Sequence, residues 1–522
     1  MLGAGTNRMN IYKVARASTG VAKYVLENAK GKDFSIAIAY DSRNNSELFA
    51  KTAAAVYAGV GIHVYIYPEL MPTPSLSYAV RNLHCDAGVV VTASHNPAKY
   101  NGYKVYGNDG GQITEMAADA ILEKINQTPY FESIPCFDTL LAEGKIEYIG
   151  EELKNAYISD AVDCATFAND ISGDLKLIYT PLNGSGLSCV TKALKKRGFN
   201  DITVVPEQEK PDGNFPTCPY PNPEIKEALE LGLALMKKTG ADLLLATDPD
   251  CDRVGTAVPV GDSYRLISGN EMGVLLLDYI CREKLANGTM PKEPIAVKTI
   301  VTTDMVYEVA KKYGIRIVDV LTGFKYIGEQ ISLLVKDNKE ENYLLGFEES
   351  YGYLCSGFVR DKDGVSTSVL ICEMATKYKE QGKTLADRMD ELYAEFGTYR
   401  NFVDSFAFEG SSGMDKMNGI MTFLRENPPA EILGHKLLKV YDYWLSESVS
   451  MESGEKEILY LPKSNVIKFI YDDGLGVVAR PSGTEPKLKI YYTVKADSEK
   501  ATQLLVEKLS GKEGAFATIF LR

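Results

Sequence analysis

Short apolar segments alternate with amphipathic ones along the first two-thirds of the chain, in a unit that occurs three times. In its first occurrence, strands are predicted at residues 35–40, 63–67 and 87–91, with helices at 47–58 and 75–82. Apolar runs of this length, separated by segments with a 3.6-residue period, are typical of parallel α/β sheets. The pattern therefore predicts an α/β domain at the start of the chain.

The second and third occurrences repeat this order of elements. Their predicted strands are 175–179, 202–205, 242–246, 295–298, 315–319 and 343–345, and their predicted helices are 186–197, 224–238, 304–312 and 326–335. After them the pattern changes: strands at 475–480 and 489–494 flank a polar loop, and a helix follows at 498–509. The fold class predicted is three similar α/β domains with mixed or parallel sheets plus a C-terminal α+β domain, with boundaries at 1–150, 151–268, 269–400 and 401–522.

Each occurrence of the repeat ends in a polar segment. TASHNP follows the strand at 87–91, TDPDCDR follows 242–246, and GFEES follows 343–345. Ligands of α/β folds bind beyond the carboxyl ends of the strands. We therefore expect three loops from three domains to face one central cleft.

Composition narrows the class of partner. Among 522 residues 45% are hydrophobic and 24% charged, as in soluble globular enzymes, and no apolar run is long enough to span a membrane. The N-terminus lacks a secretory signal pattern, and nine cysteines without metal-ligand spacing favour reduced thiols and a cytoplasmic location. The net charge of −13 disfavours nucleic acid and membrane surfaces, so local cations have to hold any anionic substrate.

The TDPDCDR segment predicts a metal site. Asp248, Asp250 and Asp252 can turn three carboxylates onto one cation, and Mg²⁺ accepts such oxygen ligands. An EF-hand is excluded, because its sixth and twelfth positions hold Arg253 and Pro259 instead of Gly and Glu. The alternative is a plain surface turn, in which three uncompensated carboxylates repel one another.

The ARPSGTEPKLKIY segment predicts a phosphate-binding loop, because arginine, hydroxyl and backbone N–H donors follow one another around a glycine. The candidates are Arg480, Ser482, Gly483, Thr484, Lys487 and Lys489. The alternative is a polar turn in which Ser482 and Glu485 form a capping box.

Two other segments are weaker signals. Glu348, Glu349 and Ser350 in GFEES suit the hydroxyl groups of a sugar, although acids at a helix start are equally compatible with them. The NGSGLSC segment resembles a dinucleotide fingerprint, but Cys189 stands where the third glycine is required, so NAD binding is not expected.

Ser94 in TASHNP has three interpretations: a helix cap, a hydrolase nucleophile or a carrier of phosphate. The flanking residues are not those of a nucleophile elbow, and we expect the adjacent His95 to point away from Ser94. A predicted magnesium site and phosphate loop favour the carrier. Lys104 lies just downstream, where a cationic neighbourhood would lower its pKa toward the range useful for proton transfer.

Together, TASHNP, DPDCDR, GFEES and RPSGTEPK, in this order over nearly the whole chain, resemble the motifs of the α-D-phosphohexomutase superfamily. The resemblance implies four domains around a cleft, one Mg²⁺ per chain, and a phosphoserine that gives its phosphate to a sugar phosphate. The bisphosphate formed, glucose 1,6-bisphosphate for a glucose enzyme, then turns around and returns its other phosphate.

The resemblance also assigns roles to single residues. Ser94 resembles the phosphoserine and lies beside the metal ligands Asp248, Asp250 and Asp252, while Lys104 resembles the acid/base. Arg253 resembles the arginine near the phosphoserine, with His95 as a loop-shaping neighbour. The residues that resemble sugar contacts are Glu348, Ser350 and Lys325, and those that resemble the clamp on the second phosphate are Arg480, Ser482, Gly483, Thr484 and Lys489. Arg43, in YDSR, is a weaker assignment.

The residues of the GFEESYGY motif favour glucose phosphates as substrates and leave mannose and pentose phosphates as alternatives. We expect a monomer or a homodimer.

Members of the superfamily carry an F-G-T-[SA]-G-x-R-G segment shortly before a stretch like GAGTNRMN, whereas this sequence starts at MLGAGTNRMN. The expectation is an uncovered edge or apolar face in the first domain, and a further alternative is an inactive sugar-phosphate-binding protein.

Overall fold

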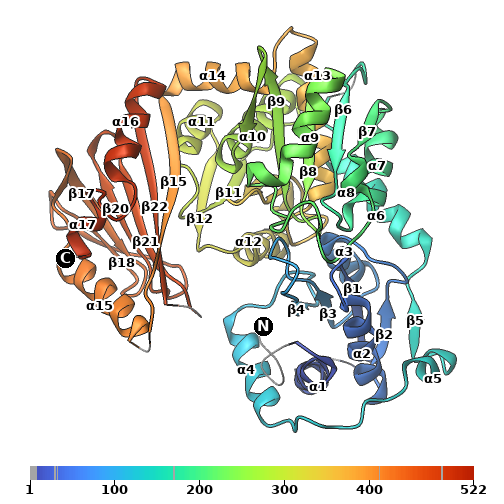
Figure 1. The fold of residues 1–522 in the computed structure, drawn as a ribbon. Coiled ribbons are helices and arrows are strands. Elements are labelled where there is room, and N and C mark those ends of the chain that lie inside the picture. Colours follow the sequence, from blue (N-terminus) through green and yellow to red (C-terminus); the bar gives the residue numbers. More distant parts are fainter. Residues whose placement is uncertain are drawn as a thin grey trace. The chain divides into compact units, whose positions relative to one another are not determined.

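The computed structural model describes residues 9–28, 31, 33–168, 171–410, 412–483 and 486–521 (Figure 1). The chain forms two compact units. The first comprises Met1–Lys298, Gly314–Val318 and Gly323–Asp387, and the second comprises Thr299–Tyr313, Asp319–Thr322 and Arg388–Arg522.

The first sheet has the strand order β4-β3-β1-β2-β5. Its strands are β1 (Ser35–Tyr40), β2 (His63–Ile66), β3 (Ala87–Val91), β4 (Lys104–Gly107) and β5 (Ile146–Tyr148), and its helices are α1 (Ile11–Asn28), α2 (Ser46–Gly59), α3 (Thr73–Asn82), α4 (Glu115–Asn126) and α5 (Phe137–Ala142). All pairs are parallel except β3 with β4. Every residue of β3 is buried, which explains its uninterrupted apolar sequence AGVVV.

The second sheet repeats this plan in the order β10-β9-β8-β6-β7. Its strands are β6 (Leu177–Thr180), β7 (Ile202–Val204), β8 (Leu243–Thr247), β9 (Val254–Val260) and β10 (Ser263–Ile267), and the helices around it in sequence are α6 (Glu151–Cys164), α7 (Gly186–Arg197), α8 (Pro206–Glu209), α9 (Lys226–Thr239) and α10 (Gly269–Ala286). β8 is completely buried, like β3.

The third sheet has the order β12-β11-β13-β14. Its strands are β11 (Ile295–Thr299), β12 (Arg316–Val320), β13 (Tyr343–Phe347) and β14 (Tyr353–Leu354), and the helices of this region are α11 (Met305–Tyr313), α12 (Phe324–Lys336), the 3₁₀ turn η2 (Glu340–Asn342), α13 (Gly364–Lys379) and α14 (Leu385–Phe396). β13 is again buried throughout and lies parallel to β11.

The C-terminal sheet is antiparallel, in the order β15-β22-β21-β20-β17-β18-β19, and β16 pairs with β17. Its strands are β15 (Thr398–Ala407), β16 (Glu431–Ile432), β17 (His435–Asp442), β18 (Glu447–Ser450), β19 (Lys456–Ile458), β20 (Ile467–Tyr471), β21 (Gly476–Pro481) and β22 (Lys487–Ala496), with α15 (Gly413–Glu426), η3 (Asp472–Gly474), α16 (Glu499–Leu509) and α17 (Ala517–Phe520). Apolar side chains from the sheet and from all three helices form its core.

The fold class predicted from the sequence is confirmed. Strands 35–40 and 87–91 and helix 186–197 were predicted with the observed ends, and the other elements differ by one or two residues. The C-terminal sheet is larger than the two strands predicted, and β15 spans the boundary predicted at residue 400. The four domain ranges remain predictions. Among the described residues, no helix is long and apolar enough to cross a membrane.

Candidate active site

Ser94 lies in the loop after β3, and its side chain faces the loop after β8. The Ser94 hydroxyl donates a hydrogen bond to Asp248 Oδ2 at 2.9 Å. Its backbone N–H donates to Thr92 Oγ1 at 2.8 Å, and its φ angle of 52° is in the left-handed region. Since non-glycine residues in this region are concentrated at functional sites, the conformation fits a reactive serine.

The expectation that His95 points away from Ser94 is wrong. His95 Nδ1 lies 3.2 Å from Ser94 Oγ. Ser94 has a left-handed backbone, so the alternation of side chains along an extended strand does not continue through it. Burial first and the nearby Arg253 second lower the pKa of His95 to about 3, so the ring is neutral at neutral pH.

Asp248, Asp250 and Asp252 form a compact cluster of buried carboxylates. Their ligand atoms lie within 4.8 Å of one another, and each residue is at most 1% exposed. Burial and then the neighbouring Asp250 and Asp252 carboxylates raise the pKa of Asp248 well above its ordinary value. Among the described residues, the Oδ1 atoms of Asp250 and Asp252 are buried and find no hydrogen-bond partner. Orphaned carboxylate oxygens in an all-oxygen cluster fit a hard divalent cation.

The expectation that a cationic neighbourhood lowers the pKa of Lys104 is also wrong. Lys104 Nζ donates to Asp250 Oδ2 at 3.0 Å and lies 3.6 Å from Asp252 Oδ2. Burial alone would lower the pKa of Lys104, but these two carboxylates outweigh it and raise the pKa above its ordinary value. The surroundings of Lys104 are therefore mainly anionic, and its amine is protonated.

Sequence reasoning missed two residues that contact the carboxylate cluster. Lys362 Nζ lies 3.2 Å from both Asp252 Oδ2 and Asp361 Oδ1, and Thr73 Oγ1 donates to Asp250 Oδ2 at 3.0 Å. The charged run RDKD, immediately before α13, was a visible signal for Lys362. Thr73 gave no such signal, because the sequence around it indicates only the start of a helix.

The NGSG segment that resembles a nucleotide-binding turn supports the metal-ligand loop. The backbone N–H and the hydroxyl of Ser185 both donate to the carbonyl oxygen of Pro249, at 2.8 and 2.9 Å. A Cβ on Gly184 would lie 2.4 Å from Pro249 Cα, and one on Gly186 would lie 2.5 Å from the Tyr179 hydroxyl. Gly184 is therefore required for the close approach to Pro249, and Gly186 for the close packing against Tyr179.

Glu348, at the end of β13, is a buried acid. Its Oε1 accepts a hydrogen bond from the Gly323 backbone N–H at 3.0 Å. Burial is the main cause that raises the pKa of Glu348 to about 7, while Lys362 opposes the shift. The carboxyl group is therefore partly protonated at neutral pH.

Two other candidates have ion-pair partners on other segments, and Arg253 Nε also lies 3.9 Å from Asp252 Oδ1 of the carboxylate cluster. The Arg253 side chain pairs with Glu224, while its backbone N–H donates to Asp248 Oδ1 at 3.0 Å. Lys325 Nζ pairs with Glu115 Oε1 at 2.7 Å, on α4. Neither side chain contacts Ser94 through these interactions.

Comparisons with known proteins place the chain in a family. Models of the four domains of phosphoglucomutase/phosphomannomutase match it: alpha/beta/alpha domain I at residues 2–131, domain II at 155–261, domain III at 268–396 and the C-terminal domain at 435–509. The chain belongs to the phosphoglucomutase/phosphomannomutase family.

The phosphoglucomutase of Staphylococcus saprophyticus is 36% identical over 499 residues, which cover 95% of this chain and 89% of that protein. A family member from Burkholderia thailandensis has the same fold, with a TM-score of 0.70, 18% identity, and coverage of 97% of this chain and 93% of that one. The N-acetylphosphoglucosamine mutase of Aspergillus fumigatus, solved with GlcNAc-6P and magnesium, gives a TM-score of 0.51 at 15% identity, with coverage of 94% and 97%.

The family's C-terminal domain carries the predicted phosphate-binding loop, within the second unit. Arg480 is the penultimate residue of β21 and pairs in register with Lys489 of β22, and the backbone N–H of Ser482 donates to the carbonyl of Lys487 at 2.7 Å. Gly483 follows in the same turn, with open space where a Cβ would stand. Thr484 lies outside the described residues.

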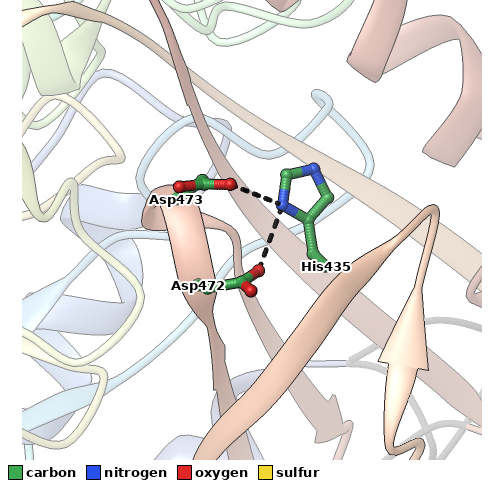
Figure 2. Close-up of side chains that lie close together, drawn as sticks. All are labelled: His435, Asp472 and Asp473. Carbon is green, nitrogen blue, oxygen red and sulfur yellow. Dashed lines mark ion pairs between the residues drawn. The ribbon is translucent and has the colours of Figure 1, made fainter.

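A second group of possible metal ligands lies in this same domain of the family. Figure 2 shows the His435 ring facing Asp472 and Asp473. His435 Nδ1 lies 3.4 Å from Asp472 Oδ1 and 3.8 Å from Asp473 Oδ2, and Asp472 Oδ1 also accepts from the Lys436 backbone N–H. These are ion-pair contacts of a partly exposed turn. In contrast to Asp248, Asp250 and Asp252, the group has no orphaned buried oxygen among the described atoms.

Proposed function

We propose that this protein is a phosphoglucomutase, which interconverts glucose 1-phosphate and glucose 6-phosphate through a phosphorylated Ser94 and a glucose 1,6-bisphosphate intermediate. The observation that carries the proposal is the hydrogen bond between the Ser94 hydroxyl and Asp248, a member of the buried three-carboxylate cluster. The curated relatives that bear the name phosphoglucomutase support glucose as the sugar. We also propose a cytoplasmic location.

In the proposed reaction, the bond between phosphorus and Ser94 Oγ breaks as a bond forms between phosphorus and a sugar hydroxyl oxygen. The hydroxyl loses a proton and Ser94 Oγ regains one. The bisphosphate then returns its other phosphate to Ser94 by the reverse exchange, so no phosphate is consumed. Lys104 is the proposed acid/base group, and its protonated amine supplies the acid form.

Asp248, Asp250 and Asp252, with Ser94 beside them, are the proposed ligands of one Mg²⁺. When bound, this ion neutralises the charge on the transferring phosphoryl oxygens. The magnesium in the Aspergillus mutase complex supports this choice of ion. Glu348, Ser350 and Lys325 remain proposed sugar contacts, and Arg480, Ser482, Gly483, Thr484 and Lys489 remain the proposed clamp on the second phosphate.

A coupled assay tests the reaction. Conversion of glucose 1-phosphate to glucose 6-phosphate, with Mg²⁺ and glucose 1,6-bisphosphate as activator, is expected for the wild type and absent for Ser94→Ala. Absence of turnover in the wild type would contradict the proposal. The kcat/KM values for glucose, mannose and pentose phosphates then decide the preferred sugar, and we expect the glucose value to be highest.

An inactive sugar-phosphate-binding protein is the alternative from another class. Intact-mass measurement after incubation with glucose 1,6-bisphosphate distinguishes the two. Addition of one phosphate to the wild type, and none to Ser94→Ala, is expected for a mutase. A phosphate that persists on the alanine variant would show that another residue is the carrier.

A further inference from the structure

Arg43 follows β1 and extends its side chain into the loop that carries Ser94. The residue is only 3% exposed. Its Nη1 donates to the carbonyl oxygens of Pro97 and Tyr100, both at 3.0 Å, and its Nη2 donates to the carbonyl oxygens of Ser94 and Asn96. One side chain therefore binds four carbonyl groups of a single loop.

The guanidinium group has no exposed donor left for a substrate. Arginine has five N–H groups, and the two on Nη1 and the two on Nη2 are used by the four carbonyls. The fifth, on Nε, is buried without a hydrogen-bond partner among the described residues, and it lies 3.2 Å from Asp41 Oδ2 in a fully buried ion pair. Arg43 is thus oriented toward the protein backbone, and a phosphate could bind it only by displacing these contacts.

Asp41 extends the same network to the backbone of Ser94. The Thr92 hydroxyl donates to Asp41 Oδ2 at 2.6 Å, and Thr92 Oγ1 in turn accepts from the Ser94 N–H at 2.8 Å. The hydroxyl of Ser46 and the backbone N–H of Arg43 donate to Asp41 Oδ1, at 2.8 and 2.9 Å. Asp41 therefore both neutralises Arg43 and fixes the group that holds the Ser94 N–H.

This network opposes a conformational cost. A φ angle of 52° is unfavourable for a non-glycine residue, and it persists only where the surroundings over-determine it. The contacts on both sides of Ser94, its N–H to Thr92 and its carbonyl to Arg43, supply that constraint.

Arg43 also contacts a loop of the second α/β region. Its guanidinium lies 5.1 Å from the centre of the Phe215 ring, and the side chain of the next residue, Asn44, donates to Asn214 Oδ1 at 2.9 Å. A Cβ on Gly213 would lie 2.4 Å from Asn44 N. The segment that holds the Ser94 loop is therefore packed against the region that supplies the carboxylate cluster.

We propose that Arg43 is a positioning residue, which holds the Ser94 loop in the conformation that aims Oγ at Asp248 and does not itself bind the substrate. The proposal rests on the proposed function. It assigns to Arg43 an effect on the rate of phosphoryl transfer and none on the affinity for the sugar phosphate.

Steady-state kinetics of Arg43→Lys and Thr92→Val test it. A lysine has a single cationic head group and cannot hold four carbonyls, and valine keeps the shape of threonine without its hydroxyl. We expect kcat to fall about 100-fold for Arg43→Lys, because misplacement of a reacting group by about 1 Å lowers the rate by about this factor. For Thr92→Val we expect a smaller fall, of about 10-fold. KM for glucose 1-phosphate is expected to stay within about 3-fold of the wild type, since the residues that bind the substrate are unchanged in both variants.

Arg81→Lys is the matched control, because Arg81 is a partly buried arginine of the same region that binds the carbonyl of Asp109 in another loop. Its kcat is expected to stay within about 2-fold, as for surface changes away from the site. Amide hydrogen exchange gives a readout independent of turnover: the amides of Ser94, Asn96 and Tyr100 should exchange at least about 10-fold faster in Arg43→Lys, while those of α2 stay protected.

Three outcomes would overturn the proposal: a kcat within 3-fold of wild type for both variants, a rise in KM at unchanged kcat, or unchanged exchange in the Ser94 loop. If Arg43→Lys does not fold, Thr92→Val decides by the same criteria. Failure of the proposed function is recognised separately, because the wild type itself would then show no turnover.

Discussion

The loops after β3 and β8 each contain a non-glycine residue with a left-handed backbone, but they are stabilised in different ways. In the first loop the residue is Ser94, with φ 52°, and an arginine side chain holds its carbonyl groups. In the second it is Cys251, with φ 53°, which is completely buried. The backbone of the second loop is held mainly by other backbone groups, since the N–H groups of Thr73, Ser185 and Gly364 donate to its carbonyls.

The difference separates an accessible loop from a buried one within one site. Residues 93–100 of the first loop are partly or fully exposed, whereas residues 247–252 of the second are all buried. A loop that accepts and returns a phosphoryl group has to be accessible, and a polar side chain can position it without burying it. A cluster of carboxylates needs fixed geometry for one cation, and a packed backbone provides it. Changes in the first loop should therefore affect turnover, and changes around the second should also affect stability.

The largest effect is expected for Ser94→Ala. Loss of the phosphate carrier should lower kcat at least about 10⁴-fold while the melting temperature stays within a few degrees, as for loss of an essential nucleophile. Ser42→Ala is the matched control, because the Ser42 hydroxyl is buried without a hydrogen-bond partner. Strong destabilisation by Ser94→Ala would break the proposed contrast between the loops.

Asp250→Asn tests the carboxylate cluster. We expect kcat to fall about 10²- to 10³-fold, the size seen when one group that stabilises transition-state charge is lost. Thermal unfolding separates this effect from a folding defect: Mg²⁺ at 100 times its Kd should stabilise the wild type by about 2.7 kcal/mol, and a chelator should remove that gain. The asparagine variant should lose most of the response to Mg²⁺. An undiminished response would show that the ion binds elsewhere.

Gly184→Ala tests the backbone support of the second loop. The new Cβ would lie 2.4 Å from Pro249 Cα, and overpacking of this kind costs about 1–3 kcal/mol. The free energy of unfolding, measured with urea, should fall by that amount, and turnover should fall with it. In Gly150→Ala the added Cβ meets open space, so a loss below about 1 kcal/mol is expected. Equal losses in both variants would mean that the close approach has no special role.

The smallest effect is expected for Glu348, which follows β13 of the third sheet. A single buried acid stands there, in contrast to the three carboxylates after β8. With a folded-state pKa of about 7 against an ordinary 4.5, the folded protein binds the proton more tightly than the unfolded chain. Stability therefore falls as pH rises through 7, and between pH 6 and 8 this group should account for about 1 kcal/mol. Urea unfolding at both pH values should show this slope in the wild type and not in Glu348→Gln. Equal slopes in the two proteins would contradict the assigned pKa.

Much of the fold followed from periodicity, because buried strands such as AGVVV of β3 are short, apolar and bounded by polar loops. The carboxylate cluster was visible because its three members are close in sequence. The contacts of Lys104 with Asp250 and of Lys362 with Asp252 join residues 146 and 110 positions apart, and no local pattern reports them. The orientation of His95 was missed because it depends on a left-handed backbone at Ser94, which a serine rarely adopts.

The loop after β8 also has a consequence for synthesis on the ribosome. Its partners are spread widely along the chain: Thr73 donates to the carbonyl of Asp250, Ser185 to that of Pro249 and Gly364 to that of Cys251. Domains fold as they emerge, from the N-terminus onward. About 360 of the 522 residues therefore have to leave the ribosome before the last of these contacts can form. A nascent chain shorter than that already contains all three carboxylates, but their loop still lacks its contact with Gly364.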